Sequence, residues 1–349
     1  MRSQPGDKRP TIRDIAALAG VSRGTVSRVL NGGDRVSPQA QAAVAKAIAQ
    51  TSYTASHAAR SLALGRSNTV VFLLTEPQHR LFEDPTFSRL MSGCTAALSR
   101  SGMLLTLVTT DITEGRGPVI GYLTGQHVGG VLLVSNHVGN PIINDLIAAR
   151  VPTVVCGRFP EFETRLSMVG SDDRDGGRRM TEHLISRGAT RIATITGAMD
   201  TPGGFERLEG YQQALRAAGL PIRPQLIGHG DYTQACGGAA MKALLIKTPD
   251  LDAVFVASDL MAAGALAVLR DFGRRVPDDV LVAGFDDGAV AESLTPPLTT
   301  MRLPFDLISS EMVRLLVNRI EGGDPATVTV PTTLIPRAST LRPENPGGA

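Results

Sequence analysis

Residues 11–31 read TIRDIAALAGVSRGTVSRVLN, and this stretch determines how the N-terminal part of the chain folds. Apolar residues at helical spacing predict a first helix that begins after Thr11 and ends at Gly20, because a threonine side chain caps a helix N-terminus and glycine adopts the left-handed conformation that ends a helix. A second helix is predicted from Ser22 to the Asn31-Gly32-Gly33 cluster. Two short helices joined by a glycine-containing turn form a helix-turn-helix.

The second helix has a polar, basic outer face that contains no acidic residue. This composition suits a helix lying in the major groove of duplex DNA, where arginine donates hydrogen bonds to guanine O6 and N7. An ordinary helical hairpin is the competing interpretation, and it gives no reason for a face without carboxylates. The face comprises Ser22, Arg23, Thr25, Ser27, Arg28 and Asn31.

A third helix is expected from 37 to about 51, with Ser37 as its cap and Pro38 at the first helical position. Tyr53 is expected to close the small core that the three helices form. The terminal segments 1–10 and 342–349 are polar and contain Pro and Gly, so we expect both to be disordered.

Charge is unevenly distributed along the 349 residues. The whole chain carries a net charge of +2, with 42% apolar and 19% charged residues, as in a globular protein. Residues 1–67 hold ten Lys/Arg and three Asp/Glu, a net charge of +7, which leaves −5 for the remainder. A basic segment on a mildly acidic body indicates a polyanionic partner, and duplex nucleic acid is the leading candidate. A solvated basic tail is the alternative on charge alone.

From Thr69 onward, short apolar runs alternate with helical stretches. Such runs predict parallel sheets covered by helices on both faces, and two successive sets predict two α/β lobes with a ligand cleft at the strand carboxyl ends. The expected strands are 69–75, 103–109, 129–135, 151–156, 166–171, 191–196, 225–229, 252–257 and 280–285. The expected helices are 85–100, 141–150, 175–187, 203–218, 233–247 and 259–273.

Signals for enzymatic function are missing from this pattern. No phosphate-binding glycine motif follows the first strand, which ends in Thr75-Glu76-Pro77, so no nucleotide cofactor is expected. The carboxylate pairs Asp172-Asp173 and Asp286-Asp287 are adjacent in sequence and tend to point apart, which makes them poor acid–base pairs. We therefore expect no enzymatic activity and no cofactor.

Signals for metal binding, secretion and membrane insertion are missing as well. The six histidines lack metal-ligand spacing and the three cysteines include no CxxC pair, so we expect no metal site and a reducing compartment. No apolar N-terminal segment and no run of 18 apolar residues occurs, so neither secretion nor a membrane partner is expected. These features predict a cytoplasmic protein.

The N-terminal segment resembles the DNA-binding head and hinge of the lactose-repressor/galactose-repressor (LacI/GalR) family through the motifs AGVSRGTVSRVLN, RVSP and HAARSL. The resemblance implies a DNA-binding head over 11–56 and a hinge helix with linker over 57–68. In the family Arg23 and Gly24 would select operator bases, and Leu62 would wedge between base pairs in the minor groove. The implied DNA contacts are Thr11, Ser22, Arg23, Gly24, Thr25, Arg28, Asn31, His57, Ala59 and Leu62.

The acidic body resembles the effector domain of the same family through VGSDDRDGGRRMTEHL, ERLEGYQQAL, AVFVASDLMAAGAL and VPDDVLVAGFDD. The resemblance implies a periplasmic-binding-protein-like domain for effector binding and dimerisation over 69–341. Its implied N-lobe spans about 69–160 and 299–328, and its implied C-lobe spans about 161–298 and 329–341. The segment 76–86, EPQHRLFEDPT, is longer than the usual loop there, and we expect it at the mouth of the cleft.

The implied effector contacts are Arg158, Arg207, Tyr232, Asp286 and Phe305. Their chemistry suits a saccharide, because a guanidinium donates in a planar fork, a carboxylate accepts from hydroxyls, and flat rings pack against the C–H face of a sugar. Core packing is the alternative for Phe305. A surface ion pair with Glu206 or Glu209 is the alternative for Arg207.

These observations predict a dimeric, sequence-specific transcription factor, most simply a repressor of carbohydrate-utilisation genes. Its expected partners are a near-palindromic operator, a mono- or oligosaccharide effector and a second copy of the chain. Two alternatives stay open, namely a sugar- or solute-binding protein without a regulatory role and a repressor that responds to a non-sugar metabolite.

Overall fold

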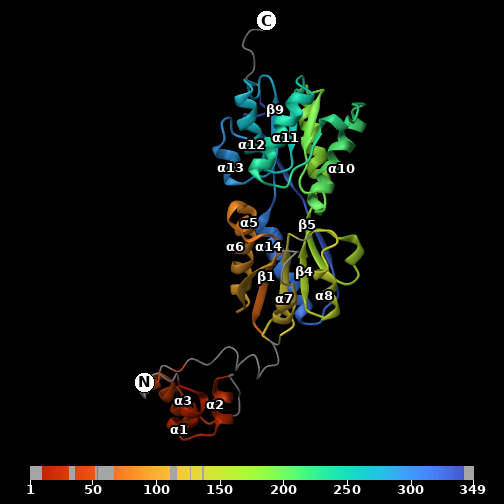
Figure 1. Ribbon diagram of the computed structural model, residues 1–349. Coiled ribbons are helices and arrows are strands. Elements are labelled where there is room, and N and C mark those ends of the chain that lie inside the picture. The colour runs from red at the N-terminus through yellow and green to blue at the C-terminus, as the bar shows by residue number, and fades with distance from the viewer. Residues whose placement is uncertain are drawn as a thin grey trace, which may run out of the picture. The chain divides into compact units, whose positions relative to one another are not determined.

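The computed structural model describes residues 10–30, 36–51, 53, 67–110, 116–125, 127–135 and 137–341. The chain divides after Ser67 into an N-terminal unit and a C-terminal unit (Figure 1). The hinge-helix prediction for 57–66 and most of the two expected disordered tails lie outside the described residues.

The N-terminal unit is a three-helix bundle made of α1 (Ile12–Ala19), α2 (Arg23–Leu30) and α3 (Pro38–Thr51). Its core residues are Ile15, Ala16, Val26, Val44 and Ala47, with Tyr53 packed against them as predicted. The helix-turn-helix predicted from the sequence is therefore confirmed.

Local capping defines the ends of these helices. Thr11 and Asp14 form a capping box at the start of α1, in which the Asp14 carboxylate accepts the Thr11 N–H at 2.8 Å. Gly20 ends α1 in the left-handed conformation, with φ of 66°. The Ser22 hydroxyl accepts the Thr25 N–H at 3.1 Å and caps α2. These contacts hold the turn that orients α2.

The C-terminal unit contains two six-stranded sheets, which we call the N-lobe and C-lobe sheets. The N-lobe sheet has the order β11-β5-β4-β3-β1-β2 and the C-lobe sheet the order β12-β10-β9-β8-β6-β7. Among the described residues, neighbouring strands pair in parallel except β10 with β12, which are antiparallel. The N-lobe strands are β1 (Thr69–Leu74), β2 (Leu104–Thr109), β3 (Gly130–Val134), β4 (Thr153–Cys156), β5 (Ser167–Ser171) and β11 (Thr327–Val330). The C-lobe strands are β6 (Ile192–Ile195), β7 (Ile227–Gly228), β8 (Ala253–Val256), β9 (Leu281–Asp286), β10 (Thr299–Arg302) and β12 (Thr333–Ile335).

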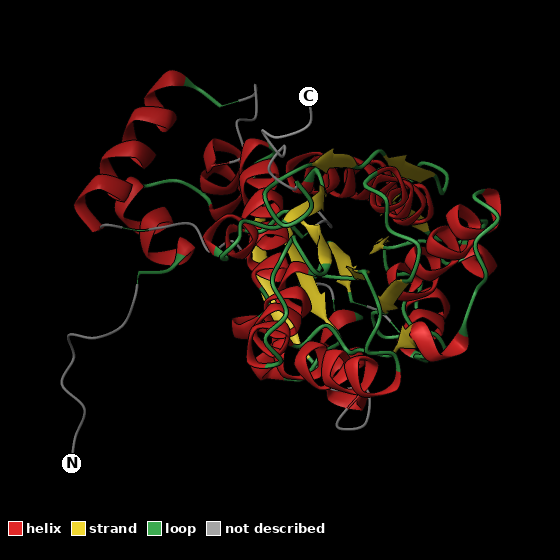
Figure 2. Ribbon diagram, turned by 90° about the horizontal axis from the view of Figure 1, so that it is seen from above, coloured by secondary structure: helices red, strands yellow, loops and turns green. Residues whose placement is uncertain are grey.

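Helices surround the strands of both lobes (Figure 2). The N-lobe carries α5 (Gln78–Glu83), α6 (Pro85–Arg100), α7 (Arg116–Leu123), α8 (Ile142–Ala148) and α14 (Phe305–Ile320). The C-lobe carries α9 (Asp173–Ser186), α10 (Pro202–Ala217), α11 (Gln234–Lys247), α12 (Asp259–Asp271) and α13 (Ala289–Ser293). Among the described residues, no helix has the length and apolar character needed to cross a bilayer.

The lobe boundaries predicted from the sequence are wrong by one strand at two of the three crossings. Strand β5 lies in the N-lobe, because it pairs with β4, although the expected boundary at 160/161 assigned it to the C-lobe. Strand β10 pairs with β9 in the C-lobe, although 299–328 was assigned to the N-lobe. Apolar patterning identifies a strand but says nothing about which sheet it joins, because pairing depends on contacts between distant residues.

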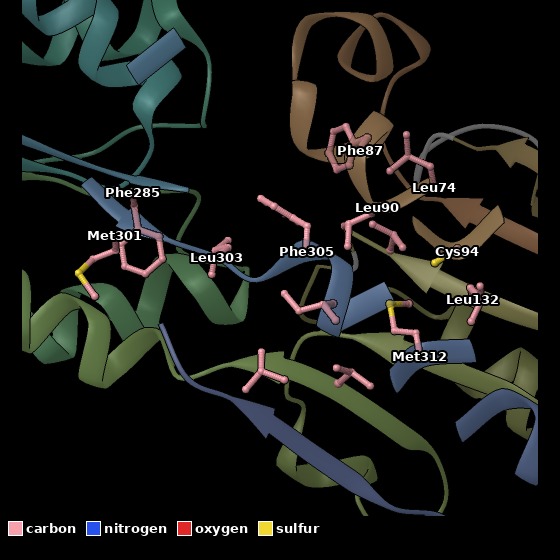
Figure 3. Close-up of a cluster of buried hydrophobic side chains, with 14 of the residues drawn as sticks. Leu74, Phe87, Leu90, Cys94, Leu132, Phe285, Met301, Leu303, Phe305 and Met312 are labelled. Carbon is pink, nitrogen blue, oxygen red and sulfur yellow. The ribbon is translucent and has the colours of Figure 1, made fainter. Parts of the chain in front are cut away.

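One buried hydrophobic cluster includes residues of both lobes. Phe285 and Met301 come from C-lobe strands, and Met312 lies on α14 in the N-lobe. Figure 3 shows Leu303 and Phe305 on the segment between them, where the chain passes from one lobe to the other. This segment therefore packs its side chains where the two lobes meet.

Candidate functional site

A cavity of about 980 Å³, counted to its open mouth, lies between the two lobes of the C-terminal unit. Its walls come from segments that follow the carboxyl ends of strands in both sheets, which is the usual ligand position in open α/β sheets. All five effector contacts expected from the sequence, Arg158, Arg207, Tyr232, Asp286 and Phe305, line this one cavity.

Arg207 is the most highly constrained side chain of the cavity. Its Nε donates to Asp173 Oδ1 at 2.7 Å, and its Nη1 donates to the Ala257 carbonyl at 2.5 Å. Asp286 Oδ1 lies 3.5 Å from Nη1, and the guanidinium carbon lies 3.7 Å from the centre of the Phe285 ring. These contacts hold the planar fork in one orientation before any ligand arrives.

The surface alternative for Arg207 does not apply, since its side chain is only 8% exposed. Glu209 forms its ion pair with Arg174 instead. Burial opposes the charge on Arg207, but the carboxylates of Asp173 and Asp286 outweigh it and raise the Arg207 pKa above its ordinary value. Burial raises the pKa of Asp286, and the Arg207 charge offsets this only in part.

Two aromatic rings flank this network. The Tyr232 hydroxyl lies 3.2 Å from the Thr201 hydroxyl, and Tyr232 has a φ of 70°, which is rare for a residue with a side chain. Phe305 is 3% exposed and belongs to the hydrophobic cluster of Figure 3 while also lining the cavity. The guanidinium carbon of Arg89 lies 4.3 Å from the centre of the Phe305 ring. Phe305 therefore packs in the core and also presents a surface to the cavity.

Arg158 borders the same cavity from the segment after β4. A Cβ atom built on Gly170 would lie 2.9 Å from Arg158 Cγ, so glycine there leaves room for the arginine stem. The Arg158 Nε atom is buried and has no hydrogen-bond partner among the described residues.

Four charged residues of the cavity wall, Arg80, Asp84, Asp173 and Glu206, were not among the effector contacts expected from the sequence. Asp173 was rejected as half of an acid–base pair, yet it is the main partner of Arg207 and also accepts the Ser171 hydroxyl at 2.7 Å. Arg80 and Asp84 lie in the long segment 76–86, in which Gln78–Glu83 form α5 and Pro85 begins α6. The unusual length of that segment was the only signal for them.

In the N-terminal unit, the expected DNA-contacting residues of α2 share one accessible face. Ser22, Arg23, Gly24 and Arg28 are exposed, and Thr25 is half-buried. Arg28 Nε donates to the Gly24 carbonyl at 3.3 Å, which lays the arginine along the helix surface. Thr11 is exposed at the start of α1. The remaining expected contacts, Asn31, His57, Ala59 and Leu62, lie outside the described residues.

Comparison with known proteins identifies the family. Residues 11–56 match the bacterial regulatory proteins of the lacI family, and residues 181–340 match the periplasmic binding protein-like domain. The HTH-type transcriptional regulator CelR of Thermobifida fusca is 46% identical over 335 residues, which cover 95% of this chain and 98% of that protein. The chain belongs to the lacI family of bacterial regulatory proteins. The ribose operon repressor of Escherichia coli K12 is 35% identical, covering 89% of this chain and 93% of that protein.

Solved structures of the lacI family agree with the fold. A CelR–cellobiose complex has a TM-score of 0.75 and 45% identity, covering 95% of this chain and all of that one. A Lac repressor dimer bound to operator and the anti-inducer ONPF has a TM-score of 0.84 and 25% identity, covering 96% of this chain and all of that one. The chain is thus a DNA-binding transcriptional regulator. The alternative interpretation as a sugar- or solute-binding protein without a regulatory role no longer applies. Family members are regulators and not enzymes.

Proposed function

We propose that this regulator is a repressor whose operator affinity is controlled by cellobiose or a closely related disaccharide. The observation that carries the proposal is the Arg207–Asp173–Asp286 network beside Tyr232 and Phe305 in one interlobe cavity. The 46% identity to CelR, whose solved structure contains cellobiose, supports the choice of sugar.

The network suits vicinal hydroxyl groups. The bonds from Nε and Nη1 hold the Arg207 guanidinium in place, while Nη2 makes no hydrogen bond among the described residues. A sugar oxygen can accept from Nη2 while a neighbouring hydroxyl donates to Asp286. The bond from Nη2 involves a charged group, which makes it stronger than a bond between neutral groups.

The charge balance of the cavity favours an uncharged ligand. Three guanidinium groups line it, those of Arg80, Arg158 and Arg207, and they face four carboxyl groups. The carboxyl groups belong to Asp84, Asp173, Glu206 and Asp286. A neutral polyol fits this balance better than an anion, because it leaves the existing ion pairs intact.

We infer that ligand binding acts on DNA through the relative arrangement of the lobes. Contacts already join them, since Arg89 Nη1 donates to the Asp287 carbonyl at 3.2 Å and the Val138 N–H donates to the Asp200 carbonyl at 2.7 Å. A ligand held by both lobes biases this arrangement, which in a homodimer alters how the two hinge segments with Leu62 meet the near-palindromic operator. A coupling free energy of about 1–3 kcal/mol is typical of such linkage. The protein would act in the cytoplasm without catalysing a reaction.

Calorimetry and DNA binding together test this proposal. Genomic DNA fragments that the purified chain retains supply the operator, and cellobiose is then titrated into the protein and into the protein–DNA complex. We expect a saturable heat and a change in operator affinity, both of which the Arg207→Met variant loses. A chain that gives no heat with cellobiose, or a variant that responds like the wild type, would overturn the assignment of this effector to this cavity.

A further inference from the structure

Arg80 is a buried cation on α5 whose Nη1 atom has no hydrogen-bond partner among the described residues. Its side chain is 7% exposed, and its ion pair with Asp84 spans 3.7 Å from Nη2 to Oδ2, which is beyond hydrogen-bonding distance. A buried guanidinium N–H without an acceptor is costly in free energy. A ligand that supplies the missing acceptor would account for this arrangement.

Arg80 and Asp84 face the same cavity as Arg207 and Asp286. Asp84 ends α5 and caps α6, because its Oδ1 accepts the Thr86 N–H at 3.0 Å. This bond holds the carboxylate in place and leaves Oδ2 beside Arg80. The α5 segment therefore offers the cavity one fixed acceptor next to one unsatisfied donor.

The strand order separates Arg80 from the second unsatisfied guanidinium, that of Arg158. Arg80 follows β1 and Arg158 follows β4, and β3 lies between these two strands in the N-lobe sheet. Two strand spacings amount to about 10 Å. The two guanidinium groups therefore come from different segments of the N-lobe, and a ligand of two linked sugar rings can contact both of them.

The surroundings of Arg80 argue for a neutral ligand group. The Arg80 charge helps to lower the pKa of Glu76 and of Asp231, so both carboxylates lie within its electrostatic reach. Together with Asp84 these three carboxylates outnumber the two nearby cations, which are Arg80 and the His137 side chain bonded to Glu76. A phosphate or carboxylate would be repelled there, whereas a hydroxyl-bearing ring would not.

The geometry points to Arg80 and Asp84 as the subsite for the second ring of the disaccharide effector, an inference that rests on the proposed sugar response. Arg80 Nη1 donates to an oxygen of that ring, and Asp84 Oδ2 accepts from a neighbouring hydroxyl. The pair then determines whether the regulator distinguishes a disaccharide from a single sugar, while Arg207 and Asp286 bind the first ring.

Calorimetry of the full chain with cellobiose and with methyl β-glucoside tests the subsite. Arg80→Met keeps the apolar stem of the side chain and removes its donors. We expect it to weaken cellobiose binding about 10- to 100-fold, as is typical for losing a hydrogen bond to a charged group, and to leave methyl β-glucoside binding unchanged. His79→Ala, an exposed neighbour on the same helix, is the matched control and should bind both sugars like the wild type.

Asp84→Asn provides a second variant in case Arg80→Met does not fold, because asparagine also caps a helix. It should show the same selective loss of cellobiose affinity. Wild-type cellobiose affinity in both folded variants, or an equal loss for the two sugars, overturns the subsite while the proposed function stands. A wild-type chain that binds neither sugar overturns the proposed function itself.

Discussion

His137 joins the two lobes and should make stability depend on pH. Its Nε2 lies 3.0 Å from Glu76 Oε1 in the N-lobe, and its Nδ1 lies 2.9 Å from Asp200 Oδ2 in the C-lobe. The hydrogen bond to Glu76, and then that to Asp200, overcome the effect of burial and raise the pKa of His137 from 6.5 to about 9. The imidazolium is therefore favoured in the folded protein.

A raised folded-state pKa stabilises the protein fully below the unfolded value of 6.5, and this stabilisation is lost as pH rises through about 9. Between pH 7 and pH 9 the loss amounts to about 2 kcal/mol by linkage. Asp200 is 57% exposed, so solvent screening reduces the expected loss to about 1 kcal/mol.

Urea unfolding of the wild type and His137→Asn at pH 7, 8 and 9 measures this effect. Circular dichroism is the suitable probe, because the chain contains no tryptophan. The difference in unfolding free energy between the two proteins should shrink by about 1 kcal/mol from pH 7 to pH 9. His79→Asn, an exposed histidine, is the control and should show a constant difference. A constant difference for His137→Asn as well would refute the role assigned to this imidazolium.

Three further substitutions test the DNA-binding face, the cavity and the packing of the C-lobe. Arg28→Ala should weaken binding to the retained genomic fragment by at least about 10-fold, as expected for a base contact. The cellobiose affinity of this variant should be unchanged. Equal DNA affinities of the variant and the wild type in a gel-shift assay would exclude a contact of Arg28 in the major groove. Asp286→Ala should abolish the sugar response in the same gel-shift assay and keep DNA affinity; a normal response would exclude its role in the cavity. Gly210→Ala places a Cβ 2.1 Å from the Arg174 carbonyl between α9 and α10, and should lower unfolding free energy by about 2 kcal/mol or more. Gly117→Ala, with nothing within 4 Å of its Cβ, is the control in urea unfolding and should differ little from the wild type.

Element identity was most predictable where local signals agreed. The expected helix 85–100 matches α6, because Asp84 caps it and Pro85 occupies its first position. The expected strand 225–229 was mostly wrong, since Pro224–Leu226 form a 3₁₀ turn and only Ile227–Gly228 pair as β7. Pro224 fixes φ at a value that suits such a turn. The short apolar run after it therefore gave a wrong prediction of a strand over 225–229.

The residues after 298 contain a helical pattern that the sequence analysis did not use. No helix was predicted there, yet Phe305–Ile320 form α14, and its buried residues include Phe305, Ile308, Met312 and Leu316 at helical spacing. The same periodicity that located α6 would have located α14. The helical spacing of apolar residues was therefore present in the sequence of α14 but was not used to predict this helix.

The amino-acid sequence was sufficient to establish the helix-turn-helix, the two α/β sets and the family, because caps, apolar periodicity and a basic face are all local properties. It did not decide which lobe receives β5 and β10, or that Asp173 rather than Glu206 pairs with Arg207. Those outcomes depend on which distant segments the sheets bring together. Arg80 is the sharpest example, since only the packed structure leaves its buried Nη1 without a partner at the wall of the cavity.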